Sequence, residues 1–101
     1  MTEAELILNC IKQDRKSQKL LYERYSSTMY AICIRYTHQR DNALDVLQDG
    51  FIKVFSKIPD YKGIGSFEGW MKKIFIHTAI NYYHKVKNLS EYFSTILSLL
   101  W

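Results

Sequence analysis

The sequence predicts an all-α fold, a compact bundle of about four helices joined by short connections. Apolar residues recur every three or four positions along successive stretches, a spacing that places them on one face of a helix. The chain contains one Pro and four Gly, whereas β-rich folds with tight turns require many of both. Its 101 residues, 48% hydrophobic and 24% charged, fit one ordinary globular domain and exclude disordered, collagen-like and disulfide-scaffold proteins.

The first two helices are predicted from capping and apolar spacing. Thr2 and Glu5 form a capping box ahead of the first apolar run, so a helix is expected over about 2–14. A second apolar run begins after Ser17, and its spacing predicts a helix that extends to about Thr37.

The third helix is predicted between a polar start and a proline stop. Asp41 offers a side-chain cap to an apolar run that Pro59 is placed to end, so a helix is expected over about 41–58. The following residues, 59–66, contain the only Pro and half of the glycines, and this segment is predicted to be a loop.

The fourth helix is expected to be long. Ser66 offers a cap, and a strongly apolar face then continues over about 67–88. The C-terminal tail, residues 89–101, is apolar, and one interpretation is a fifth helix, capped at Ser90, that either packs on the bundle or exposes an apolar interaction surface.

Other sequence features bear on location and partners. Cys10 and Cys33 lie among apolar neighbours and are expected to be reduced core thiols. The acidic N-terminus lacks a secretory signal, and no apolar run approaches the ~20 residues of a membrane span, so no membrane insertion and a cytoplasmic location are expected.

The third predicted helix is acidic in a chain whose net charge is +4. Asp41, Asp45 and Asp49 follow one another at four-residue steps with Gln48 beside them, and these residues form what we call the carboxylate ridge. The simplest explanation is a solvated face, with Asp41 stabilising the start of the helix. Because Asp49 lies two turns further on, beside Gly50, a surface that docks a partner is the alternative.

The fourth predicted helix carries the opposite charge. Its basic stripe consists of residues at four-residue steps, Lys73, His77, Asn81 and Lys85, with His84 adjacent. Ammonium groups attract phosphates, His and Asn can read base edges, and aromatic rings can stack on unpaired bases. The aromatic candidates are Tyr61, Tyr82 and Tyr83, so the pattern indicates single-stranded nucleic acid.

No pattern in the sequence indicates an enzyme or a cofactor. His77 and His84 lack a third ligand of suitable spacing, which argues against a metal site. The sequence shows no nucleophile beside a base and no glycine-rich phosphate loop. Trp70 and Tyr82 fall on the apolar face of the fourth helix and are expected to be packing residues.

Three stretches together resemble a known family. They are residues 43–55, ALDVLQDGFIKVF; residues 61–67, YKGIGSF; and the run that begins FEGWMKKI at residue 67 and continues to Tyr82. They are similar, in the same order, to the helical domain called region 2 of bacterial extracytoplasmic-function (ECF) sigma factors of the sigma-70 family. The resemblance covers about residues 3–88.

The resemblance implies a transcription initiation module that binds the RNA polymerase core and recognises and melts the promoter minus-ten element. The residues implied to contact the clamp coiled coil of the β′ subunit are Asp45, Gln48 and Asp49, with Leu47 and Phe51 on the core side. The residues implied to hold a base flipped from the single-stranded non-template strand are Tyr61, Lys62, Gly63, Ser66, His77 and Asn81. Those implied to bind DNA phosphates are Lys72, Lys73, His84, Lys85 and Lys87.

Three further expectations follow from the resemblance. Trp70 matches a position near the point of strand opening, so a wedge role is the alternative to core packing. Many relatives carry Asn where this chain has His77, which implies a different base preference and a response to pH. An anti-sigma factor is an expected partner.

The domain organisation implied is region 2 over residues 1–88, followed by the apolar tail or linker remnant over 89–101, with region 4 absent. The chain is then expected not to recognise the upstream promoter element, and to be either a fragment or a shortened protein that competes for polymerase. The alternative function is an all-α interaction protein, a decoy or adaptor that binds polymerase or an anti-sigma factor without contacting DNA.

Overall fold

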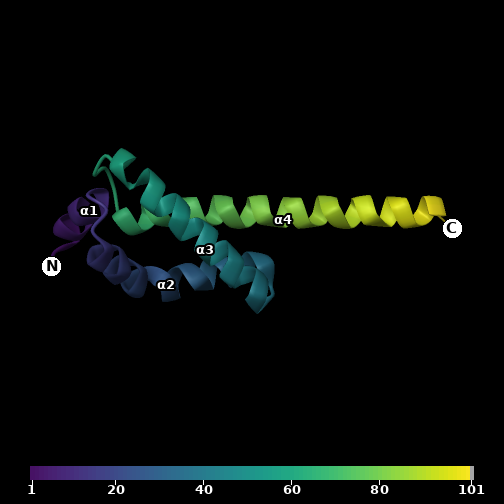
Figure 1. Ribbon diagram of the computed structural model, residues 1–101, viewed down its shortest axis with the longest axis horizontal. Coiled ribbons are helices and arrows are strands. Elements are labelled where there is room, and N and C mark those ends of the chain that lie inside the picture. Colours follow the sequence, from purple (N-terminus) through teal and green to yellow (C-terminus); the bar gives the residue numbers. More distant parts are fainter. Residues whose placement is uncertain (101) are drawn as a thin grey trace.

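The computed structural model describes residues 1–100, without the side chain of Ser90. The elements within this range are α1 (Glu3–Ile11), α2 (Arg15–Thr37), α3 (Arg40–Lys57), the short 3-10 helix η1 (Ile58–Asp60) and α4 (Phe67–Leu100). The prediction of an all-α bundle is confirmed, and no strand occurs among these residues. The helices α2 and α3 run antiparallel, α4 packs on both, and its C-terminal half projects beyond them (Figure 1).

The boundary between α1 and α2 differs from the prediction. The helix α1 ends at Ile11 instead of continuing to residue 14, because Gln13 adopts a left-handed conformation with φ 64°. Asp14 then caps α2: its carboxylate accepts hydrogen bonds from the backbone N–H of Ser17 at 3.1 Å and from the Ser17 hydroxyl at 2.6 Å. A cap three residues before Ser17 explains why α2 starts earlier than expected.

The start of α3 also corrects the prediction, whereas the predicted caps at the starts of α1 and α4 are confirmed. The helix begins at Arg40 after Gln39, so Asp41 lies in the first turn and does not cap it. At α1, the Thr2 hydroxyl accepts from the Glu5 N–H at 3.2 Å, and at α4 the Ser66 hydroxyl accepts from the Gly69 N–H at 3.0 Å. An aspartate in the first turn still favours the helix through its dipole.

One apolar core joins all four helices. Its fully or nearly fully buried residues include Leu6, Leu21, Met29, Val46, Val54, Met71 and Phe75. Cys10 and Cys33 are buried and unpaired, as predicted for core thiols. Burial raises the pKa of Cys33 to about 11, so this thiol stays protonated and unreactive at neutral pH.

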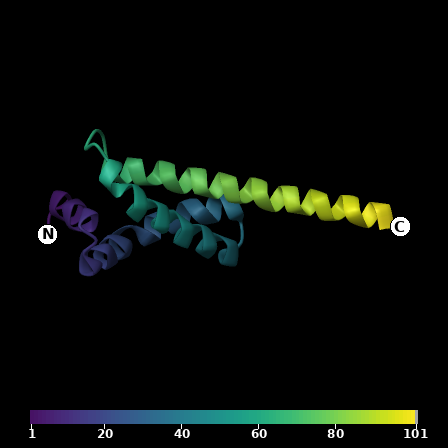
Figure 2. The same ribbon diagram turned by 45° about the horizontal axis from the view of Figure 1, so that its top comes forward.

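The tail is helical, but it does not form a separate fifth helix. The helix α4 continues without a break to Leu100, because no Pro or Gly interrupts residues 70–100. The side chain of Ser90, the expected cap of a fifth helix, and residue Trp101 lie outside the described residues. Figure 2 shows that α4 stays straight as it leaves the bundle.

The contact between α1 and α2 predicts a dependence of stability on alkaline pH. Burial, followed by the hydrogen bond to Glu3 at 2.9 Å, raises the pKa of Tyr25 from 10.0 to about 12. As pH rises, Tyr25 therefore loses its proton at a lower pH in the unfolded chain than in the folded chain. The free energy of unfolding consequently falls as pH rises from about 10 to about 12. Tyr25→Phe should reduce this fall, as measured by urea unfolding at a series of pH values.

Tyr83, which is exposed, supplies the control for this experiment. The Tyr83→Phe variant should show the same alkaline fall in stability as the unmodified chain. An unchanged pH dependence in Tyr25→Phe would contradict the assigned role of Tyr25.

Candidate nucleic-acid and protein interface

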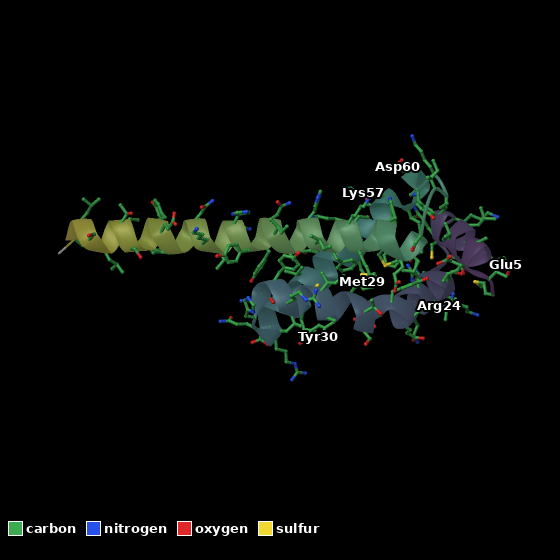
Figure 3. All side chains as sticks on the ribbon, turned by 180° about the vertical axis from the view of Figure 1, so that it is seen from behind. Glu5, Arg24, Met29, Tyr30, Lys57 and Asp60 are labelled. Atoms are coloured by element: carbon green, nitrogen blue, oxygen red, sulfur yellow. The ribbon has the colours of Figure 1, made fainter. Side chains whose placement is uncertain are left out.

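A groove with excess positive charge lies where the end of α3 passes the first half of α4. It has a volume of about 370 Å³ and is lined by Lys53, Lys57, Asp60, Trp70, Lys73, Ile74, His77, Thr78 and Asn81. We call it the cationic groove, because three ammonium groups face a single carboxylate, that of Asp60. Figure 3 shows Lys57 and Asp60 together at the end of the bundle where α4 begins. Such a surface suits a phosphate-bearing ligand.

A second groove continues from the first along the same two helices. It has a volume of about 380 Å³ and is lined by Asp45, Gln48, Asp49, Lys53, Thr78, Asn81, Tyr82 and Lys85. We call it the mixed groove, since two carboxylates face two ammonium groups. Lys53, Thr78 and Asn81 line both grooves, so the two grooves adjoin, and the charge of the lining changes from balanced in the mixed groove to an excess of positive charge in the cationic groove.

Lys53, which is not among the predicted site residues, lies where the two grooves adjoin. Its side chain is half-buried, and its ammonium donates a hydrogen bond to the Thr78 hydroxyl at 3.3 Å. That hydroxyl in turn donates to the Ile74 carbonyl at 2.7 Å. A signal was available, because Lys53 and Lys57 continue the four-residue steps of the carboxylate ridge along α3.

The carboxylate ridge is open to solvent. Asp45, Gln48 and Asp49 are all exposed, and the apolar residues expected on the opposite side, Leu47 and Phe51, are buried at 4% exposure each. The three polar side chains line one wall of the mixed groove. This arrangement leaves them free to contact a partner that carries positive charge.

The structure divides the basic stripe between the two grooves. Lys73, His77 and Asn81 are exposed and line the cationic groove. Lys85 instead lines the mixed groove with Asp45 and Asp49. Because these carboxylates repel anions, the positive potential available to an anionic ligand is concentrated in the cationic groove, near Lys73.

The loop residues predicted to hold a base do not line either groove. The Tyr61 hydroxyl donates to the Gly65 carbonyl at 2.9 Å, and its ring packs against Phe67 and Trp70 with centroids 5.3 Å from each. Lys62, Gly63 and Ser66 are exposed in the loop between η1 and α4. Gly63 has a φ of 73°, which suits glycine and shapes this turn.

The Trp70 ring packs against the core and also lines the cationic groove. Its ring stacks on Phe67 with centroids 5.6 Å apart and planes inclined by 19°. The side chain is half-buried and lines the cationic groove. Trp70 therefore has the expected packing role, and its ring would also contact a ligand bound in the cationic groove.

The remaining predicted residues lie apart from one another. Lys72 forms an ion pair with Glu68 at 3.8 Å. His84 lines a different groove together with Arg35 and Tyr83, and Lys87 is exposed on the part of α4 that projects from the bundle. Tyr82 packs on the core, and its hydroxyl donates to the Asn42 amide oxygen at 2.7 Å, so the three tyrosines do not form one stacking platform.

Among residues 1–100, no group of three or more His, Cys, Asp or Glu side chains is arranged to hold a metal ion. Within residues 1–100, no helical segment combines the length and the hydrophobicity that a membrane span needs. The fold and grooves define an all-α binding domain that presents an acidic and a cationic surface on adjacent helices.

Comparison with known proteins identifies the family. Residues 21–88 match Sigma-70 region 2, so the chain belongs to the sigma-70 region 2 family. Similar curated proteins include the ECF RNA polymerase sigma-E factor of Haemophilus influenzae, 32% identical over 81% of this chain and 43% of that protein. The RNA polymerase sigma-H factor of Pseudomonas aeruginosa is 28% identical over 79% of this chain and 42% of its own length.

A solved structure supports the same assignment. An NMR structure of an engineered region 2 of sigmaE, in complex with GTAAAA, matches with a TM-score of 0.73 and 30% sequence identity. The match covers 81% of this chain and 85% of that chain. By contrast, the chain spans only about two fifths of the length of the curated sigma factors that it matches.

Proposed function

We propose that this chain is a non-enzymatic transcription initiation module. It binds the RNA polymerase core through the carboxylate ridge and captures the single-stranded non-template strand of the minus-ten element in the cationic groove. The observation that carries the proposal is the pair of adjoining grooves along α3 and α4, which share Lys53 and differ in charge. The similarity to a region 2 solved with a short oligonucleotide supports the choice of ligand.

For polymerase binding, we assign contact with the clamp coiled coil of the β′ subunit to Asp45, Gln48 and Asp49. Their exposure and spacing support this role, because one face of α3 presents them together. An anti-sigma factor that covers the same ridge would compete with the polymerase, and such a factor is a proposed partner.

For DNA binding, we assign base recognition to His77 and Asn81, whose donors and acceptors line the cationic groove. Lys57 and Lys73 hold flanking phosphates, and Lys53 separates the bound strand from the ridge. Trp70 acts as the wedge at the edge of the groove. The loop residues expected to complete the base site, Tyr61, Lys62, Gly63 and Ser66, reach it only if the loop shifts toward α4.

We also propose that the sigma region 2 domain occupies residues 1–88. Residues 89–101 then form a tail or linker remnant that takes no part in polymerase or DNA binding. The family match ends at residue 88, and among the described side chains of α4, Tyr82 is the one furthest along the helix that forms a hydrogen bond to the rest of the bundle. Flipping a base out of the strand costs about a few kcal/mol of lost stacking. We propose that a domain of this size does not supply this free energy alone, so the polymerase must hold the DNA strands apart.

Fluorescence titration with single-stranded minus-ten DNA tests the proposed function. The chain bound to core polymerase should capture the strand, whereas the isolated chain should bind it weakly at physiological salt. Nanomolar binding by the isolated chain would contradict the dependence on polymerase. Co-purification with polymerase without any DNA capture would favour the alternative function, a decoy that occupies polymerase without contacting DNA.

A further inference from the structure

The C-terminal half of α4 carries an apolar surface that the proposed function does not use. We call residues 86–100 the overhang; this segment is about 22 Å long at 1.5 Å per residue. Among its described side chains none is buried, and only Ile96 is half-buried. Figure 3 shows these side chains projecting from α4 with no other element beside them.

The overhang is amphipathic. Its apolar side chains are Val86, Leu89, Tyr92, Phe93, Ile96, Leu97, Leu99 and Leu100, and together they cover about 160° of the helix circumference. The opposite arc carries Lys87, Asn88, Glu91, Ser94, Thr95 and Ser98. The overhang propagates from the packed half of α4, but its own apolar face gains no tertiary packing, so a partner that covers this face would stabilise it.

The spacing of these residues continues the packing pattern of the bundle. Phe75, Ala79 and Tyr82 face the core, and the same alternation of four- and three-residue steps continues through Val86, Leu89, Phe93, Ile96 and Leu100. This is a heptad repeat, the pattern that packs one helix against another. The first part of the seam packs on α2 and α3, and the second part extends past the turn between them.

We propose that the occupant is a second copy of this chain, packed antiparallel along the overhang. A membrane surface is disfavoured, because the polar arc carries only Lys87 and Glu91 as charges, and interfacial helices are rich in Lys and Arg there. An identical seam is a suitable partner, since pairing two copies brings no like charges together in the apolar interface.

The position of the bundle selects the antiparallel direction. The helices α2 and α3 cover the seam up to Tyr82, whose hydroxyl donates to Asn42 near the α2–α3 turn. In a parallel pair, two bundles would compete for the same space in front of the seam. In an antiparallel pair, each overhang fills the space beyond the turn of its partner, and Phe93 lies at the two-fold axis opposite its own copy.

Sedimentation of the full chain tests the pairing. The mass should rise with concentration to about twice the 12.0 kDa of one chain. Phe93→Glu should keep the chain monomeric, whereas the matched control Ser94→Glu, on the polar arc, should behave as the unmodified chain does. Retained thermal unfolding of the bundle would show that Phe93→Glu still folds.

Cysteine cross-linking tests the direction, because the native Cys10 and Cys33 are only 2% and 0% exposed and do not compete. Phe93→Cys should form disulfide-linked pairs by itself. Val86→Cys and Leu100→Cys should cross-link only when the two variants are mixed.

Several results would overturn the proposal, and none of them depends on the proposed function. The proposal is wrong if the measured mass stays that of one chain at every concentration, or if the assembly contains more than two copies. Pairing that survives Phe93→Glu, or Val86→Cys cross-linking to itself, would exclude the antiparallel seam. A monomer that co-sediments with anionic phospholipid vesicles would assign the overhang to membranes instead.

Discussion

Replacing Gly50 with Ala is expected to lower the free energy of unfolding by about 2 kcal/mol, because Phe75 occupies the space that a methyl group would need. Three ring carbons of Phe75 would clash with it, the farthest, Cζ, at 2.8 Å. The ring is fully buried and packs edge-on against Phe51 with centroids 5.0 Å apart, so it has little freedom to move aside. The clash outweighs the gain of ~1 kcal/mol in helix propensity. Urea unfolding measures the difference.

Gly69 provides a matched control in a helix. The nearest atoms to a methyl group there belong to Ser66 at 3.6 Å, which is ordinary contact. Gly69→Ala should therefore leave stability unchanged or raise it by up to ~1 kcal/mol. Shortening the opposing side chain with Phe75→Leu should recover part of the loss in Gly50→Ala, and strictly additive effects of the two substitutions would contradict a direct clash.

Reversing the charges of Lys57 and Lys73 together is expected to reduce DNA capture by the polymerase-bound chain on the order of a hundredfold. Both line the cationic groove, and the variant should also lower the salt dependence of binding by about two in slope. Lys85→Glu should have a smaller effect, because Asp45 and Asp49 share its groove and already repel phosphates. Titration with labelled single-stranded DNA at several salt concentrations measures all three quantities.

The opposite variant separates the two surfaces. Asp45→Lys with Asp49→Lys should abolish co-purification with core polymerase, while Lys57→Glu with Lys73→Glu should leave it intact. Lys12→Glu with Lys16→Glu makes the same change in net charge at exposed positions around the end of α1 and should leave both kinds of binding unaffected. If the double variant at Lys12 and Lys16 loses as much DNA capture as the double variant at Lys57 and Lys73, net charge alone drives binding. That result would contradict a specific groove.

The sequence predicted most of the helices because their apolar spacing and caps are local signals. The cap from Ser66 and the stop near Pro59 lie where they were expected. The misplaced boundary near residue 14 came from a single left-handed residue, Gln13, whose backbone conformation no apolar pattern indicates. The tail was expected to start a new helix, but continuity of α4 depends only on the absence of a helix breaker.

The candidate site was only partly predictable for a different reason. Residues on one helix face, such as Asp45 and Asp49, could be grouped from their spacing alone. Lys53 and Lys57 were not predicted as site residues, because they form a site only together with α4, which places Lys73 and His77 on the other wall of the same groove. Helix spacing gives no information about which face of a neighbouring helix lies opposite.

The sequence by itself determined the helical class, the two charged faces and the family resemblance, since these follow from residue spacing along each helix and from the order of motifs along the chain. Only the tertiary structure decided that the two grooves adjoin, that Lys85 stands across from the ridge, and that Gly50 makes room for Phe75. The physical reason is that the crossing of α3 and α4 is set by the packing of the whole core. Contacts between helices therefore depend on side chains far apart in the chain.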